Sequence, residues 1–187
     1  MKKKLNIKFI TGLGLLLAVE VVLSFISNYI PGSVNPNLAL IPISIGAILY
    51  GPLGGAILGA ANGIITIIAP QTIAFFVPVN LIATIVLCIL KTGLAGVVAS
   101  VVYRLLKKWN EKIAIVLSSF LVPIVNTGIF ILGVLMFFLS IYGEGQAAVG
   151  ALFSTVISIN FAIELILSIL LAPAVVYVIN IASKRIK

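Results

Sequence analysis

Long apolar runs follow one another along the chain, and short polar or proline-containing segments separate them. A helix needs roughly 20 apolar residues to cross a bilayer, with a rise of about 1.5 Å per residue. On this basis the pattern predicts six membrane-spanning helices, at about residues 8–30, 38–50, 53–69, 80–103, 113–141 and 151–181. Residues 1–187 are thus expected to form a single all-α transmembrane domain without a soluble part.

Proline and glycine mark the boundaries of the two shortest predicted helices. The run at 38–50 is short and has Pro42 near its start, which indicates a kinked or re-entrant helix. Gly51-Pro52 carries no charge and predicts a tight turn into the next helix. The segment QTIAFFVPVN, residues 71–80, is expected to be an irregular external loop or a short helix.

Eleven of the twelve Lys and Arg residues fall in three short stretches that alternate with the apolar runs. Basic residues are retained on the cytoplasmic side of membranes, so all three stretches are expected there. An even number of crossings must then separate each pair, and both chain termini are expected to be cytoplasmic. The three clusters are Lys2, Lys3, Lys4 and Lys8; then Arg104, Lys107, Lys108 and Lys112; then Lys184, Arg185 and Lys187.

Composition supports membrane residence and argues against catalysis. The chain is 62% hydrophobic and 9% charged, with a mean hydropathy of +1.33, which is too apolar for a soluble domain. The net charge of +8 is assigned to cytoplasmic loops and not to a nucleic-acid surface. With no His and no Asp, a zinc site or a Ser-His-Asp triad lacks its residues, and no P-loop motif occurs. We therefore expect no enzyme, no metal and no cofactor.

Glycines recur every fourth residue in the third predicted helix, at Gly51, Gly55, Gly59 and Gly63. Residues four apart share one face of a helix, so these glycines form a smooth face that lets another backbone approach closely. Packing inside this protein is the favoured interpretation, and an interface with another subunit is the alternative.

Placing an ionisable residue at the bilayer centre costs roughly 2.5–3.5 kcal/mol, so such a residue in the predicted helices should have an interaction partner or a functional role. Lys91 lies in the fourth predicted helix, at a depth similar to Glu20 and Glu164. It either pairs with a carboxylate or faces a ligand cavity. Polar side chains on predicted helices four to six would suit a pocket that opens outward. For each Asn among them, a hydrogen bond between helices is the alternative. The set consists of Asn80, Lys91, Asn126, Asn160 and Glu164.

Two segments, ILYGPLGGAILGAANGI at 48–64 and PIVNTGIFILG at 123–133, are similar to segments of a known transporter family. Through them, and through its length and predicted topology, the chain resembles the substrate-binding subunit, or S-component, of energy-coupling factor (ECF-type) vitamin ABC transporters. The resemblance covers nearly the whole chain. It implies a multi-pass subunit of a prokaryotic plasma membrane that binds a small vitamin with high affinity. The vitamin would pass to a scaffold transmembrane subunit driven by two ATPases.

The resemblance also implies roles for particular residues. Asn35 and Asn37, in the first external loop, would join helices four to six in lining the pocket. Gly14 and Ala18, four apart on the first helix, would contact the scaffold subunit, although the family usually has Ala at the first of these positions.

The choice of vitamin follows from which residues are present. Thiamine binders of this family use Trp and His, whereas this chain has no His and its one Trp, Trp109, lies in an expected cytoplasmic loop. Amides, one Lys and few aromatic residues favour an anionic ligand such as pantothenate. Pyridoxine, riboflavin, niacin and a pyrimidine precursor are the alternatives. A stand-alone carrier and a structural subunit are the competing classes of function.

Overall fold

The computed structural model describes residues 7–28, 36–143, 150–151 and 161–186. Within these ranges the chain is helical and contains no β-strand, so the all-α prediction is confirmed there. The long helices are α1 (Ile7–Asn28), α2 (Leu40–Ile67), α3 (Leu81–Leu106), α4 (Glu111–Phe137) and α6 (Ala162–Ile186). Two short segments complete the description, the π-helix η1 (Thr72–Phe76) and the 3-10 helix η2 (Leu139–Tyr142).

Helices α1, α2, α3 and α4 are each long and apolar enough to cross a membrane, judged by length and composition over the described residues. The predicted segments 8–30, 80–103 and 113–141 correspond to α1, α3 and α4. The last predicted turn of 113–141 is instead η2. The expected start of the last helix, at 151, adjoins a stretch outside the described residues. The six crossings and the cytoplasmic termini stay predictions.

Helix α2 is interrupted at Gly51, where the chain reverses. Gly51 has φ 82° and ψ −168°, a conformation that glycine tolerates because it has no Cβ. After the turn, a methyl group on Gly54 would lie 2.8 Å from the Gly46 carbonyl oxygen, so the two halves of α2 lie side by side. The tight turn predicted at Gly51-Pro52 is confirmed. We name the halves the first arm, residues 40–50, and the second arm, residues 52–67.

The second arm of α2 packs backbone to backbone on α3. A methyl group on Gly55 would lie 2.5 Å from the Gly96 carbonyl oxygen, and one on Gly59 would overlap the carbonyl of Thr92. The Thr92 hydroxyl also donates a hydrogen bond across the interface to the Gly59 carbonyl. The glycine face therefore serves packing inside this protein, as the favoured interpretation predicted.

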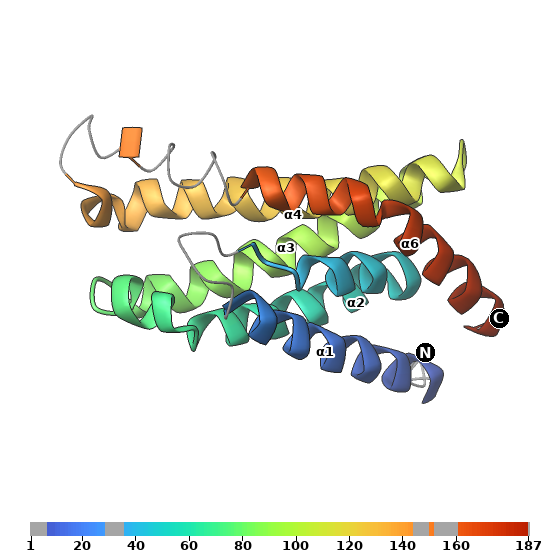
Figure 1. Cartoon of the computed structure of the whole chain (residues 1–187), viewed down its shortest axis with the longest axis horizontal. Coiled ribbons are helices and arrows are strands. Elements are labelled where there is room, and N and C mark those ends of the chain that lie inside the picture. Colours follow the sequence, from blue (N-terminus) through green and yellow to red (C-terminus); the bar gives the residue numbers. More distant parts are fainter. Residues whose placement is uncertain (1–6, 29–35, 144–149, 152–160, 187) are drawn as a thin grey trace, which may run out of the picture.

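Figure 1 shows the N-terminus, the connection between α3 and α4 and the C-terminus at one end of the bundle. The segments η1 and η2 lie at the opposite end. Helix α2 contacts α1, α3, α4 and α6 and so forms the centre of the fold. The start of α1, the connection between α3 and α4 and the end of α6 thus lie at the same end of the bundle.

Candidate functional site

A cavity of about 580 Å³ lies at the end of the bundle away from the chain termini. The C-terminal parts of α1 and α2, the segment η1, the middle of α3 and α4 and the start of α6 contribute to its wall. Its volume falls within the range of about 300–1,000 Å³ that is usual for small-molecule sites. The fold therefore offers a site large enough for a small molecule.

The short first arm of α2 leaves room for this cavity. Its eleven residues rise roughly 16 Å, about half of the 30 Å thickness of a bilayer core. The chain just before this arm, Pro36 and Asn37, lines the cavity. Where a full-length helix would continue, this fold places Pro36, Asn37 and an open volume.

A row of hydrogen bonds crosses the cavity wall and joins three helices. The backbone N–H of Asn37 donates to Glu164 Oε1 at 2.9 Å, and Asn37 Nδ2 donates to Asn62 Oδ1 at 3.0 Å. Asn62 Nδ2 in turn donates to the Ser24 hydroxyl at 3.5 Å. Among the described residues nothing donates to Asn37 Oδ1 or Glu164 Oε2, so both oxygens remain available to donors on a ligand.

Lys91 contributes a positive charge to the cavity wall. Its ammonium lies over the Phe130 ring, 4.9 Å from the ring centroid. In the part of the chain that the structure describes, neither Glu20 nor Glu164 forms an ion pair with it, so the expected alternative of a Lys–carboxylate pair is not found. Glu20 is fully buried and does not line the cavity. Glu164 lines the same cavity without forming an ion pair with Lys91, so the ammonium can still take an anionic group on a ligand.

Asn126 contributes a buried polar atom that has no hydrogen-bond partner in the described part of the chain. Its side chain is 6% exposed, it lines the cavity, and its Oδ1 has no hydrogen-bond partner. A buried amide oxygen without a donor is costly, by about 1–3 kcal/mol. An N–H or O–H group on a ligand would satisfy it.

The cavity has an aromatic wall that sequence reasoning missed. It consists of Phe75, Phe76, Phe130 and Phe161, and the rings of Phe76 and Phe130 lie 5.8 Å apart. The expectation of few aromatic residues was wrong, because these rings come from elements far apart in the chain. The available signal was spacing, since Phe130 lies one helical turn beyond Asn126.

Asn62 was also missed, although it is 1% exposed, lines the cavity and bonds Asn37. The sequence feature that could have indicated Asn62 is that it is the single amide side chain in the apolar run 53–69.

Four of the predicted pocket residues line the cavity: Asn37, Lys91, Asn126 and Glu164. The prediction for Asn80 is corrected, because it is exposed and absent from the cavity wall. Its Oδ1 accepts the Ala83 N–H at 3.0 Å and so caps the start of α3. Asn35 and Asn160 lie outside the described residues.

The predicted contact residues for a scaffold subunit lie on the outside of α1. Gly14 and Ala18 are exposed, and a methyl group on Gly14 would meet nothing within 4 Å. This face is open to a neighbouring helix.

Comparison with known proteins agrees with this architecture. The family model for the ECF transporter, substrate-specific component, matches residues 8–176. No curated protein matches the chain. The matched family comprises membrane-embedded binding subunits for vitamin-type uptake, which work with a scaffold and an ATPase module, and it is not an enzyme family. The resemblance inferred from the sequence is confirmed, and the chain belongs to the family of substrate-specific components of ECF transporters.

Proposed function

We propose that this S-component binds a small, water-soluble vitamin that carries a carboxylate, and that this vitamin is pantothenate. The observation that carries the proposal is the Lys91 ammonium, which faces the cavity without an ion pair among the described residues. Inside a low-dielectric membrane protein such a charge strongly favours an anionic partner. The ligand carboxylate would take that place.

The remaining groups of the cavity fit the rest of pantothenate. Its two hydroxyls and its amide N–H are donors for Asn126 Oδ1, Asn37 Oδ1 and Glu164 Oε2, none of which accepts a bond from another described residue. Its two methyl groups would pack on the phenylalanine wall. Asn35, proposed from the resemblance, and Asn160, proposed from the polar residues of the last helix, stay candidate ligand-binding residues.

The proposed direction of uptake is inward. The cavity lies away from the start of α1, the α3–α4 connection and the end of α6, which carry the described basic residues Lys8, Arg104, Lys107, Lys108, Lys112, Lys184 and Arg185. Basic residues are retained on the cytoplasmic side. The cavity would therefore open to the exterior of a prokaryotic plasma membrane. On the outside of α1, Gly14 and Ala18 would let a helix of the scaffold subunit approach closely, and two ATPases would drive release of the vitamin.

The test uses two ligands that differ only at the carboxylate. Purified wild-type protein is titrated with pantothenate and with pantothenol, in which a primary alcohol replaces the carboxylate. We expect pantothenate to bind at least about tenfold more tightly, which corresponds to about 1.4 kcal/mol. Lys91→Met should remove the difference, and Lys91→Arg should retain part of it. Lys108→Met, away from the cavity, is the control and should behave as wild type.

The proposal can be contradicted at three levels: the Lys91 contact, the binding of a vitamin and the need for an ATPase module. Equal binding of both ligands by wild type, or a preference that survives in Lys91→Met, would remove the Lys91–carboxylate contact. A panel of pantothenate, pyridoxine, riboflavin, niacin and a pyrimidine precursor should include at least one tight ligand. Uptake into liposomes by this chain alone, without an ATPase module, would favour a stand-alone carrier instead.

A further inference from the structure

The connection between α3 and α4 carries a basic and aromatic surface that the ligand cavity does not use. We name residues 104–113 the α3–α4 corner. Trp109, the single Trp of the chain, is 88% exposed there. Leu105 and Ile113 are also exposed, at 67% and 55%. The corner therefore presents one large aromatic ring and two aliphatic side chains to its surroundings.

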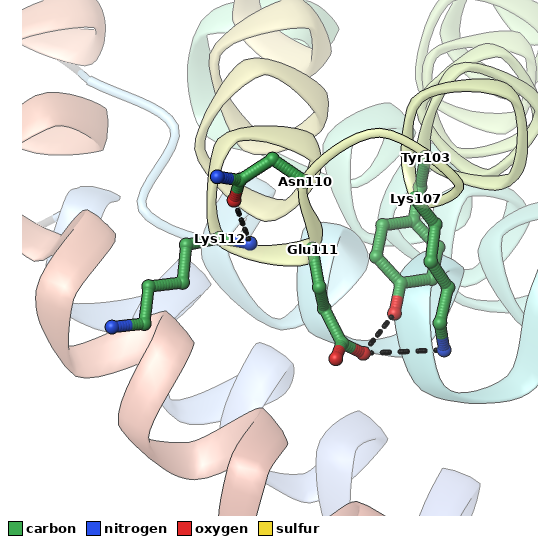
Figure 2. A network of polar contacts seen from close by, with 5 residues as sticks. All are labelled: Tyr103, Lys107, Asn110, Glu111 and Lys112. Atoms are coloured by element: carbon green, nitrogen blue, oxygen red, sulfur yellow. Dashed lines mark hydrogen bonds and ion pairs between the residues drawn. The ribbon is translucent and has the colours of Figure 1, made fainter.

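A polar network fixes the shape of the corner (Figure 2). The Tyr103 hydroxyl donates to Glu111 Oε1 at 3.1 Å, and the Lys107 ammonium lies 3.2 Å from the same oxygen. Asn110 Oδ1 accepts the N–H groups of Lys112 and Ile113 and so caps the start of α4. The contacts with the Tyr103 hydroxyl and the Glu111 carboxylate raise the pKa of Lys107, which keeps this base charged.

The corner carries more positive than negative charges. The single carboxylate of the corner, Glu111, is paired with Lys107. Arg104, Lys108 and Lys112 are exposed and form no ion pair with a described residue. Figure 2 shows Lys112 extending away from the Glu111 network. The corner thus carries three positive charges that have no ion-pair partner among the described residues, and Trp109 lies in the same connection.

The position of the corner determines what can meet these charges. Helices α3 and α4 are both candidate membrane spans, and the corner joins their ends. A surface at the end of two spans meets the headgroup layer of the bilayer, where Trp side chains are enriched. Each base near an anionic lipid surface strengthens the attraction about fivefold.

We infer that the α3–α4 corner binds the phosphate headgroups of anionic phospholipids such as phosphatidylglycerol. Lys108, Lys112 and Arg104 would contact the phosphates, and Trp109 would lie at headgroup level. This inference goes beyond the proposed function and does not depend on which vitamin the cavity takes. Charge complementarity and membrane position favour lipid over a protein partner for this surface.

Trp109 itself provides the assay, because no other Trp contributes to the emission. The full chain is reconstituted in vesicles of phosphatidylcholine mixed with phosphatidylglycerol, and one of the two lipids carries bromine on its acyl chains. Bromine quenches Trp fluorescence on contact. We expect brominated phosphatidylglycerol to quench severalfold more than brominated phosphatidylcholine at equal content. High salt should reduce the difference, because it screens exposed charges.

Two double variants make the test specific. Lys108→Gln with Lys112→Gln should equalise quenching by the two lipids. Lys184→Gln with Arg185→Gln removes the same charge from the C-terminal cluster and should keep the preference. Three results would overturn the inference: equal quenching in wild type, a preference that survives the first double variant, or no quenching by either lipid. The last result would leave a soluble or protein partner as the occupant of the corner.

Discussion

Gly59→Ala tests the close contact that holds Lys91 at the cavity. Gly59 lies on the second arm of α2, and a Cβ there would overlap the carbonyl of Thr92, the residue after Lys91. Real Cβ atoms do not come closer than about 3.0 Å to such an atom. The two backbones must therefore move apart when a methyl group is added.

The expected cost follows from three terms. Overpacking costs about 1–3 kcal/mol. Separation of the helices weakens the hydrogen bond from the Thr92 hydroxyl to the Gly59 carbonyl, for about 1 kcal/mol. Alanine regains about 1 kcal/mol over glycine in a helix interior. The net loss is about 1–3 kcal/mol, and because α3 shifts, Lys91 moves relative to Phe130 and ligand affinity falls.

The assay is thermal unfolding of purified protein, together with ligand titration. For a chain of this size, the loss corresponds to a Tm lower by about 2–12 °C. Gly93→Ala is the matched control, since it places the same methyl group on α3 where nothing lies within 4 Å. Gly93→Ala should keep or raise Tm and leave affinity unchanged. Equal stability of Gly59→Ala and Gly93→Ala would show that the backbones of α2 and α3 are not in close contact at Gly59.

Three further predictions concern the site and its surroundings. Asn126→Ala and Glu164→Ala should each weaken ligand binding at least about tenfold in a titration, or 1.4 kcal/mol, and unchanged affinity would remove either residue from the site. Asn80→Ala should lower the unfolding free energy by about 1 kcal/mol through loss of the α3 cap while leaving affinity intact; a loss of affinity would restore Asn80 to the pocket. Gly14→Leu combined with Ala18→Leu should abolish vitamin uptake by cells yet preserve binding by the purified chain, and loss of both would indicate internal packing.

The sequence predicted the helices well where composition alone decides them. Apolar runs bounded by polar residues gave α1, α3 and α4 to within a few residues, except for the last turn of 113–141. The reversal at Gly51-Pro52 was predictable because a positive φ favours glycine and proline readily begins the next helix. These are local constraints, and each can be read from a short stretch of sequence.

The site was predictable only in part, because depth in the membrane can be counted but the rotation of a helix cannot. Lys91, Glu20 and Glu164 have similar predicted depths, yet Lys91 and Glu164 line the cavity and Glu20 does not. Asn80 was assigned to the pocket by its residue type, although an Asn directly before a helix is typical of a cap.

The phenylalanine wall depends on tertiary structure. Phe76 lies in a π-helical segment, and it meets Phe130 of α4 only once α3 has brought these elements together. No periodicity within one segment predicts such a contact. The sequence therefore indicates the ionisable residues of the cavity, because such residues are rare in a membrane. It does not indicate the apolar residues of the cavity, because apolar residues are common there.

The proposed contact between Lys91 and the acidic group of a vitamin can be tested by identifying what the protein carries when it is purified. Small molecules are extracted from wild-type protein and from Lys91→Met, each prepared from the same cells, and identified by mass spectrometry. We predict a carboxylate-bearing vitamin in stoichiometric amount with wild type and its absence from the variant. A bound molecule without an acidic group, or the same amount of an acid in both preparations, would contradict a contact between Lys91 and a ligand carboxylate.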